Sequence, residues 1–273
     1  MIFIGTAGFN YADWKGHFYP KAIKAGEMLE FYAARFPVVE INSTWHALPR
    51  PENILSMARR TPTGFQFIVK AFQGLTHAAE VEDETFTQFL ESIRPLEDHG
   101  KLACILAQFP WGFRENEANR DFLRRFRERM PGRDIVVEFR NEGWIKEETT
   151  RLLEELELGF CCVDEPRLKG LVRPHVIRTS PIGYIRFNGR NYETWWDRSR
   201  RSWERYDYLY SEEEPQEWMP GIMSLQAQTE KIYLIFNNHY RSKSARNAAM
   251  MMSMLPPEIV AAVDEEPVED TLF

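Results

Sequence analysis

Seven charged residues suited to an active site fall within or just beyond the apolar runs of this chain. They are the carboxylates Glu40, Glu138 and Asp164 and the cations Lys70, Arg140, Arg186 and Arg190. Burying such charges costs several kcal/mol each unless they pair or meet a ligand. A self-satisfied salt-bridge network is the structural alternative, but apolar residues would fill a purely structural site at lower cost. The set therefore favours a pocket for an anionic ligand.

Arginine supplies the anion recognition in this hypothesis. Its planar guanidinium matches phosphate or carboxylate oxygens in a two-pronged geometry. Arg186, Asn188 and Arg190 stand two residues apart on one strand face, and Arg140 joins them from another strand. The predicted partner is therefore a small molecule that carries a phosphate or a carboxylate.

Proton transfer is assigned to the carboxylates. Glu40 and Glu138 are the expected general acid and base, provided that one is desolvated and the other is not. The spacing does not show which of them is the acid. Lys70 is predicted to be a point charge, or a nucleophilic amine if neighbouring cations lower its pKa. With Asp164, these residues form the predicted catalytic set.

Further side chains are expected to bind substrate around that centre. The substrate-binding set is Tyr11, Trp14, Asn42, His77, Gln108, Arg140, Trp144, Arg186, Asn188, Arg190 and Asn237. Its aromatic members would stack on a base or a sugar ring, with loop packing as the equally weighted alternative. A lone loop histidine such as His77 is more often solvated than functional.

A divalent metal is a less favoured alternative, and no cofactor is predicted. Oxygen and imidazole ligands would come from Glu40, Glu138, Asp164 and His239. His239 is, however, the single histidine expected at this place, and the cations named above would compete for the same carboxylates.

Eight short apolar runs must position these residues. The runs are 2–7, 38–44, 65–70, 102–108, 135–140, 160–164, 184–188 and 232–237. Helical patterns at 26–36, 51–60, 83–98, 117–130, 146–158, 221–228 and 245–255 separate most of them. This order predicts a (β/α)8 barrel of the TIM type, in which catalytic groups lie at the C-terminal ends of the strands.

Strand alternation then predicts which side chains enter the barrel mouth. In the run 38–44, Glu40, Asn42 and Thr44 share one face, and this polar-ended face should point inward while the apolar face meets the helices. The same reasoning turns Lys70, Gln108, Glu138, Arg140, Asp164, Arg186, Asn188 and Arg190 inward.

Two long aromatic loops, 8–25 and 189–220, follow the first and seventh strands and are expected to cover the mouth. The acidic tail 255–273 should be draped on the surface or frayed. The 273 residues fit a single barrel domain spanning 1–273, since such barrels take about 250 residues.

Composition narrows the function classes. A net charge of −7 and a pI near 5.5 give no general attraction for nucleic acid, so nucleic acid is not an expected partner. No apolar run approaches the roughly 18 residues of a membrane span. The three cysteines fall in predicted strands without metal-ligand spacing, which favours a reduced, cytoplasmic protein. The oligomeric state is left open.

Seven short motifs follow one another along the chain. They are Ile4-Gly5-Thr6-Ala7-Gly8, Val39-Glu40-Ile41-Asn42, Phe67-Ile68-Val69-Lys70, Gln108-Phe109-Pro110, Val137-Glu138-Phe139-Arg140, Arg186-Phe187-Asn188-Gly189-Arg190 and Phe236-Asn237-Asn238. In this order they resemble the YecE-like family (domain of unknown function seventy-two). The resemblance implies a TIM-barrel-like fold and no settled reaction. The family tends to have a histidine where this chain has Asn188, which weakens any scheme with an imidazole proton carrier there.

Three functions remain open at this point. The first is an enzyme, hydrolase- or lyase-like, that binds a small anionic molecule or nucleotide fragment and uses paired carboxylates. The second, by fold analogy alone, is a metal-dependent phosphodiesterase or endonuclease acting on nucleic acid. The third is a non-catalytic binding or scaffold protein.

Overall fold

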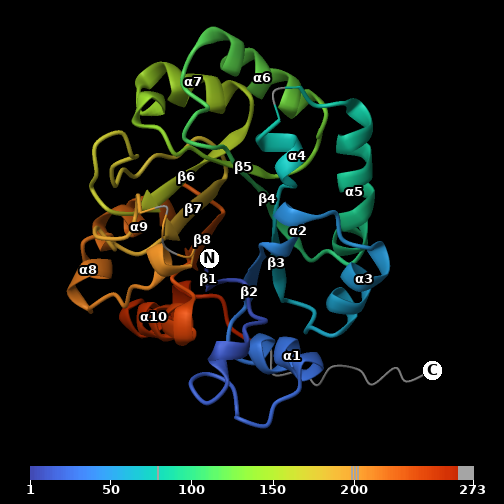
Figure 1. Cartoon of the computed structure of the whole chain (residues 1–273), viewed down its shortest axis with the longest axis vertical. Coiled ribbons are helices and arrows are strands. Elements are labelled where there is room, and N and C mark those ends of the chain that lie inside the picture. Colours follow the sequence, from blue (N-terminus) through green and yellow to red (C-terminus); the bar gives the residue numbers. More distant parts are fainter. Residues whose placement is uncertain (79, 198, 200, 202, 264–273) are drawn as a thin grey trace.

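Eight parallel strands close into a barrel in the order β1 to β8 (Figure 1). The structure is a computed structural model and describes residues 1–263 except 79, 198, 200 and 202. The strands are β1 (Ile2–Ala7), β2 (Val38–Ile41), β3 (Gln66–Lys70), β4 (Leu102–Gln108), β5 (Ile135–Glu138), β6 (Leu158–Asp164), β7 (Ile182–Phe187) and β8 (Lys231–Phe236). The predicted (β/α)8 fold class is confirmed.

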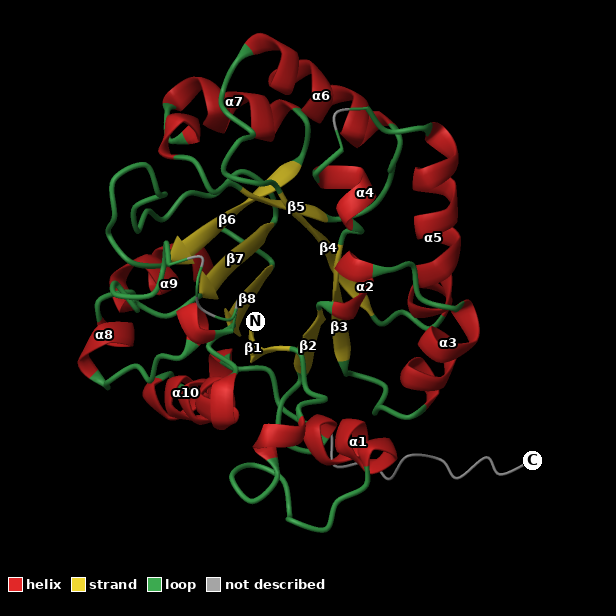
Figure 2. Ribbon diagram, in the orientation of Figure 1, coloured by secondary structure: helices red, strands yellow, loops and turns green. Residues whose placement is uncertain are grey.

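Helices surround the strands, and most of them lie in an outer ring (Figure 2). They are α1 (Met28–Ala33), α2 (Ser43–His46), α3 (Pro51–Arg59), α4 (Gln73–Thr76), α5 (Asp83–Asp98), α6 (Glu117–Glu128), α7 (Glu147–Glu155), α8 (Glu213–Gln216), α9 (Met219–Gln226) and α10 (Lys243–Met254). Short 3-10 turns occur at Ala12–Trp14, Ala25–Glu27, Glu142–Trp144, Glu204–Tyr206, Tyr240–Ser242 and Pro257–Ile259. Residues 165–181, all of them described, connect β6 to β7 without a helix.

Strands covered on both faces read as continuous apolar runs, and this explains why the sequence reveals them. Every residue of β6 and β7 is buried. On the outer face, the rings of Phe187 and Phe236 stack with centroids 4.5 Å apart and pack under the segment that carries Trp218. The inner face of β7 carries the polar side chains of Tyr184 and Arg186.

The second strand is shorter than predicted. β2 ends at Ile41, and the chain turns at Asn42 into the short helix α2, so the expectation that Asn42 and Thr44 continue the strand face was wrong. The Thr44 hydroxyl donates to the carbonyl oxygens of Ile41 and Lys70 at 3.0 and 2.6 Å. These bonds fix α2 against the end of β3.

The start of the predicted tail lies on the barrel. Val260 bridges to Ile2, and the amide of Ala261 donates to the carbonyl of Ile2 at 2.8 Å. The rest of the expected draped or frayed tail, 264–273, lies outside the described residues.

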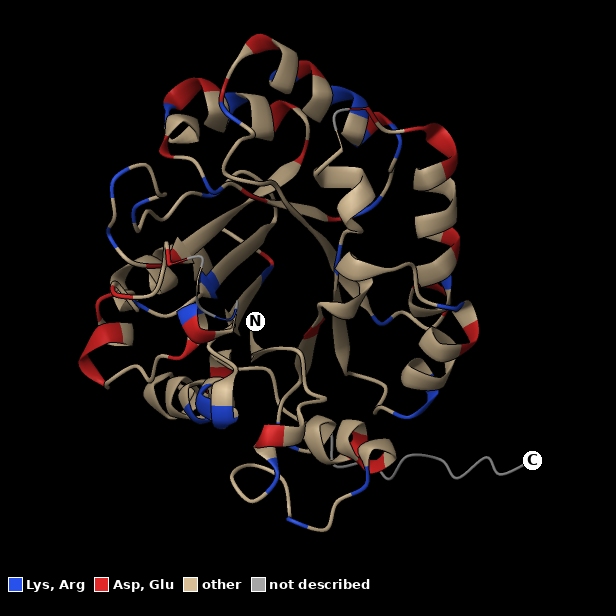
Figure 3. Cartoon of the chain, in the orientation of Figure 1, with Lys and Arg blue, Asp and Glu red and all other residues tan. Residues whose placement is uncertain are grey.

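Charges of both signs are spread around the outer helices (Figure 3). In the part of the chain that the structure describes, no helix has both the length and the apolar character needed to cross a membrane.

Candidate functional site

The guanidinium of Arg186 lies at the centre of the barrel mouth, between carboxylates from two other strands. Its Nη2 and Nε donate to the two carboxylate oxygens of Glu40, at 2.6 and 3.0 Å. Its Nη1 donates to Glu138 Oε2 at 3.1 Å. Arg186 is 1% exposed and both glutamates are 0% exposed, so the three charges are fully removed from water. The predicted convergence of these residues is what the structure shows.

Neutral groups of β7 and β8 complete this centre. The Tyr184 hydroxyl donates to Glu40 Oε2 at 2.7 Å. The amide oxygen of Asn188 accepts from Arg186 Nη1 at 3.4 Å and from Asn237 Nδ2 at 3.0 Å. Asn188 and Asn237 therefore lie where they were predicted. Tyr184 was missed, although it shares the strand face of Arg186 and could have been found from alternation.

A second arginine connects the centre to a third carboxylate. Arg140 Nη2 lies 2.7 Å from Glu138 Oε1, and Arg140 Nη1 donates to Glu165 Oε2 at 3.0 Å. Burial alone would lower the pKa of Arg140, but Glu138 and the nearby Tyr206 and Glu165 raise it overall. Tyr206 belongs to the insertion 189–220, so that insertion reaches the mouth as expected.

The carboxylates on either side of Arg140 hold their protons very differently. Burial raises the pKa of Glu165 to about 7, with Arg140 opposing the shift. Burial also acts to raise the pKa of Glu138, but Arg140, Arg186 and Lys70 lower it overall. Carboxylates whose environments separate their pKa values in this way are suited to act as acid and base. The predicted contrast in solvation between Glu40 and Glu138 is absent, because both are fully buried.

Lys70 ends β3 beside this network. Its Nζ donates to Gln108 Oε1 at 3.0 Å and lies 5.5 Å from the centre of the Trp45 ring. Burial, followed by the positive charge of Arg186, lowers the pKa of Lys70 to about 8. The side chain is only half-buried, unlike those of Arg186 and the glutamates. The side chain of Lys70 is therefore more accessible to a ligand than those of Arg186 and the two glutamates.

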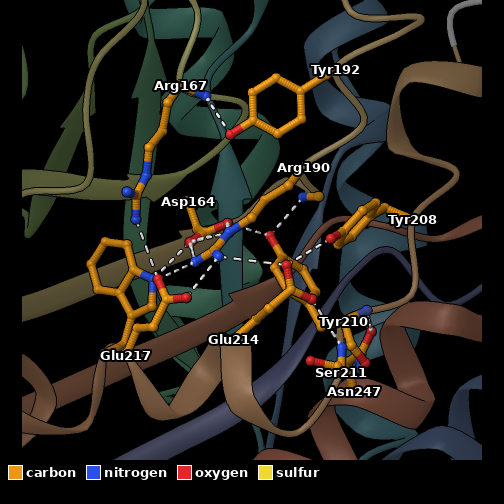
Figure 4. A network of polar contacts seen from close by, with 12 residues as sticks. Asp164, Arg167, Arg190, Tyr192, Tyr208, Tyr210, Ser211, Glu214, Glu217 and Asn247 are labelled. Carbon is orange, nitrogen blue, oxygen red and sulfur yellow. Dashed lines mark hydrogen bonds and ion pairs between the residues drawn. The ribbon is translucent and has the colours of Figure 1, made fainter.

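Asp164 does not enter the mouth, and this expectation was wrong. Its carboxylate faces the insertion, where Arg190 donates to it from Nε and Nη2 at 2.9 and 2.7 Å (Figure 4). The Tyr210 hydroxyl and the Trp218 indole donate to the same carboxylate at 2.8 and 2.7 Å. Arg190 also binds Glu217 in this network, so the prediction that its side chain joins the mouth was wrong as well.

The prediction for Asp164 was wrong because two acids follow each other at the end of β6, Asp164 as its last residue and Glu165 just after it. Cys162 and Asp164 share one face, whereas Cys161 and Glu165 share the other. Cys161 is close enough to Glu138 and Arg186 for their charges to affect its pKa, which burial raises. Glu165, on that same face, is the acid of the mouth. No signal in the strand pattern separates it from Asp164.

Two predicted stacking residues are packed inside loops. Trp14 is fully buried and its indole N–H donates to the carbonyl of His239 at 2.6 Å. Trp144 is stacked on Phe139 with centroids 4.3 Å apart and donates to the Phe113 carbonyl. These two side chains fit the packing alternative.

Tyr11, by contrast, borders an open pocket next to the mouth. Gly8, Phe9, Asn10, Tyr11, Ile41, Asn42, Ser43 and His46 line this pocket, whose volume is about 260 Å³. The Tyr11 ring stacks on His239 with centroids 4.7 Å apart. Burial and the charge of Glu40 raise the pKa of Tyr11, which shows that this pocket adjoins the charged centre. His77 is an exposed residue whose ring lies 5.2 Å from that of Trp45, and partial burial and the charge of Lys70 lower its pKa.

The four residues considered as metal ligands do not all lie at one place. Asp164 belongs to the insertion network and His239 is stacked on Tyr11. Among the described residues, no group of three or more histidine, cysteine, aspartate or glutamate side chains is arranged to hold a metal ion.

Comparison with known proteins places this barrel in a family. Residues 3–270 match the family described as "Protein of unknown function DUF72". The UPF0759 protein YunF of Bacillus subtilis (strain 168) is 30% identical over 273 residues, covering 94% of this chain and 96% of the relative. A crystal structure of a DUF72 family protein from Thermotoga maritima MSB8 superposes with a TM-score of 0.86 at 36% identity, covering 93% of this chain and 98% of that one. A second, from Enterococcus faecalis V583, gives a TM-score of 0.84 at 26% identity over 93% of this chain and 95% of that one. The chain therefore belongs to the DUF72 family, as its motifs predicted.

Proposed function

We propose that this protein is an enzyme that binds a small phosphate- or carboxylate-bearing molecule at the C-terminal mouth of the barrel. The observation that carries the proposal is the position of Lys70. Its half-buried amine has an amide oxygen as hydrogen-bond partner, and no carboxylate of a described residue lies within 4.0 Å of it. A cation without a carboxylate partner among the described residues is suited to pair with an anionic ligand.

The balance of charge in the mouth favours an anion. Three cations, Lys70, Arg140 and Arg186, face the two carboxylates Glu40 and Glu138, while the raised pKa of Glu165 leaves that group partly protonated near neutral pH. The cluster then carries excess positive charge in surroundings of low dielectric. Charge in such a cleft attracts oppositely charged substrates and strengthens their binding.

The chemistry proposed is proton transfer of a hydrolase or lyase type. Glu138 and Glu165 hold protons with different strength on either side of Arg140 and are suited to exchange them with a ligand. Both oxygens of Glu40 are occupied by Arg186, which suits a carboxylate that positions the guanidinium.

A reducing, cytoplasmic setting is part of the same proposal. Cys104, Cys161 and Cys162 are free and buried, as expected for a protein that works where disulfides do not form.

Ligand-dependent stabilisation tests the proposal. A library of phosphorylated and carboxylated metabolites is screened by thermal unfolding against the wild type and Lys70→Met, with Lys231→Met as the matched control at the opposite end of the barrel. A ligand at 100 times its Kd should add about 2.7 kcal/mol to the unfolding free energy. We expect some anions to raise the melting temperature of the wild type and the control, but not that of Lys70→Met. A library without any active anion would contradict the proposal and favour a scaffold role.

A further inference from the structure

We propose that Lys70 is a covalent catalyst, and that the ligand of the mouth is a carbonyl compound bearing an anionic group, which Lys70 captures as an imine. This inference rests on the anion-binding function proposed above and names its substrate class. A 2-oxo acid and a phosphorylated aldehyde or ketone share this chemistry.

The contacts of Lys70 differ from those of the structural lysines. Lys101 is buried and its Nζ donates to the carbonyls of Ala58 and Thr61 and to the Thr61 hydroxyl, at 2.6, 2.6 and 3.0 Å. Lys146 and Lys243 pair with Glu115 and Asp207. These bonds use the protons of a charged ammonium and leave no role for a free amine.

A single neutral acceptor holds Lys70 in place. Gln108 Nε2 donates to the carbonyl of Phe109 at 3.1 Å, which turns Gln108 Oε1 toward Lys70 Nζ, 3.0 Å away. This bond orients one N–H of the lysine and is compatible with a neutral amine. The nitrogen lone pair is then free to attack a bound carbonyl.

The surroundings favour the neutral amine. Removal from water and the neighbouring positive charges of Arg186 and Arg140 disfavour the ammonium form of Lys70. A lysine amine becomes a nucleophile when it is desolvated or lies next to another cation. At pH 8 the neutral fraction of a lysine with a pKa of about 8 is roughly a hundredfold larger than that of a lysine with the ordinary value of 10.5.

The covalent step balances without a further reactant. The lone pair of Lys70 Nζ forms a C–N bond to the carbonyl carbon, and the C=O π electrons pass to oxygen, which takes a proton. The resulting carbinolamine loses its oxygen as water, so that a protonated imine remains. Glu138 is close enough to Lys70 for its charge to act on the amine, and Glu138 and Glu165 lie on the two sides of Arg140, so these two carboxyls would supply and accept the protons of the step.

The anionic group of the ligand would meet Arg140. Each of the two arginines pairs with two carboxylates, but the side chain of Arg140 is 12% exposed and that of Arg186 is 1% exposed. Arg140 is thus the guanidinium that a bound carboxylate or phosphate can reach from the open side of the mouth.

Reductive trapping tests the inference. The protein is incubated at pH 8 with glyoxylate, a small aldehyde acid, and cyanoborohydride, which reduces an imine to a stable secondary amine. Peptide mass spectrometry then locates the modified lysines. Acetaldehyde, which lacks the carboxylate, is the matched probe, and Lys70→Arg and Lys231→Arg are the variants.

We expect glyoxylate to label Lys70 at least tenfold faster than Lys101 or Lys231, and acetaldehyde to show no such preference. Lys70→Arg should lose the label, because the substitution removes the nucleophilic amine. Lys231→Arg should behave as the wild type does.

Two negative results are distinguishable. If anions stabilise the protein but Lys70 is labelled no faster than Lys231, the covalent role is overturned and the anion-binding function stands. If no anion stabilises the protein, both proposals fail together.

Discussion

At the scale of single residues, the main feature of this molecule is the unequal environment of two buried glutamates that share Arg140. Glu138 also receives a hydrogen bond from Arg186, whereas Glu165 has Arg140 alone, and its Oε1 finds no hydrogen-bond donor among the described residues. Burial therefore dominates at Glu165 and raises its pKa to about 7. Such a carboxyl changes its charge in the neutral pH range.

The raised pKa of Glu165 predicts a pH dependence of stability. Between its ordinary pKa of 4.5 and about 7, the folded protein keeps a proton that the unfolded chain has released. The unfolding free energy should therefore fall as the pH rises through this window. Glu165→Gln removes this contribution. Urea unfolding at several pH values should show a larger stability gain for the variant over the wild type at pH 7 than at pH 5.

The test compares the unfolding free energy of the variant with that of the wild type at each pH. This difference is needed because His77 and His239 have lowered pKa values, so their titration makes the unfolding free energy rise with pH in the same range. Glu115→Gln is the matched control. Burial acts to raise the pKa of Glu115, but Lys146 and Arg120 lower it overall, so this carboxyl titrates below pH 4.5 in the folded protein. A variant-to-wild-type difference for Glu165→Gln that is constant with pH would show that Glu165 does not titrate there.

At the scale of elements, the insertion 189–220 is fastened to the barrel through the outer face of β6. The buried carboxylate of Asp164 accepts bonds from Arg190, Tyr210 and Trp218, which lie at the beginning, middle and end of this segment. The amide of Gly189 also donates to the Tyr210 hydroxyl at 2.8 Å. One anchor thus holds a long segment in position and allows Tyr206 to reach the mouth.

Trp218→Phe tests this anchor. The change keeps the aromatic packing against Phe187 but removes the indole donor to Asp164 Oδ2. A buried carboxylate that loses a donor should lower the unfolding free energy by roughly 1–3 kcal/mol, measured by urea denaturation. Trp196→Phe is the control, because Trp196 is 52% exposed and should change stability by less than about 0.5 kcal/mol. Equal effects of the two substitutions would refute the anchor.

At the scale of the whole molecule, barrel closure sets the geometry of the mouth, because the charged residues come from strands far apart in the sequence. β1 is hydrogen-bonded to both β2 and β8 and so closes the sheet. Gly5 lies where β1 pairs with β2, and a Cβ atom at this position would stand 2.1 Å from the carbonyl oxygen of Val38.

Gly5→Ala should therefore disrupt the barrel. The atom that the new methyl group would meet is the backbone carbonyl oxygen of Val38, so the clash can be relieved only if β1 and β2 move apart. We expect the unfolding free energy to fall by at least roughly 1–3 kcal/mol. Gly26→Ala is the control, because a Cβ there meets no atom within 4 Å. Circular dichroism melting compares the two variants. A Gly5→Ala protein as stable as Gly26→Ala would show that the strands are not so close.

The sequence by itself determined the barrel and most of its charged centre. Parallel strands buried on both faces must be apolar runs, and their C-terminal ends must meet at one rim, so Glu40, Glu138 and Arg186 were predictable. Lys70, Gln108 and Asn237 followed from the same rule. Only the tertiary structure decided that Glu165, and not Asp164, enters the mouth. It also decided that Arg190 lies outside the mouth and that Trp14 and Trp144 are packing residues. Alternation places side chains on opposite faces but does not say which face turns inward. Hydrogen-bond partners are likewise set by closure of the whole barrel, which brings together residues more than a hundred positions apart, such as Glu40 and Arg186.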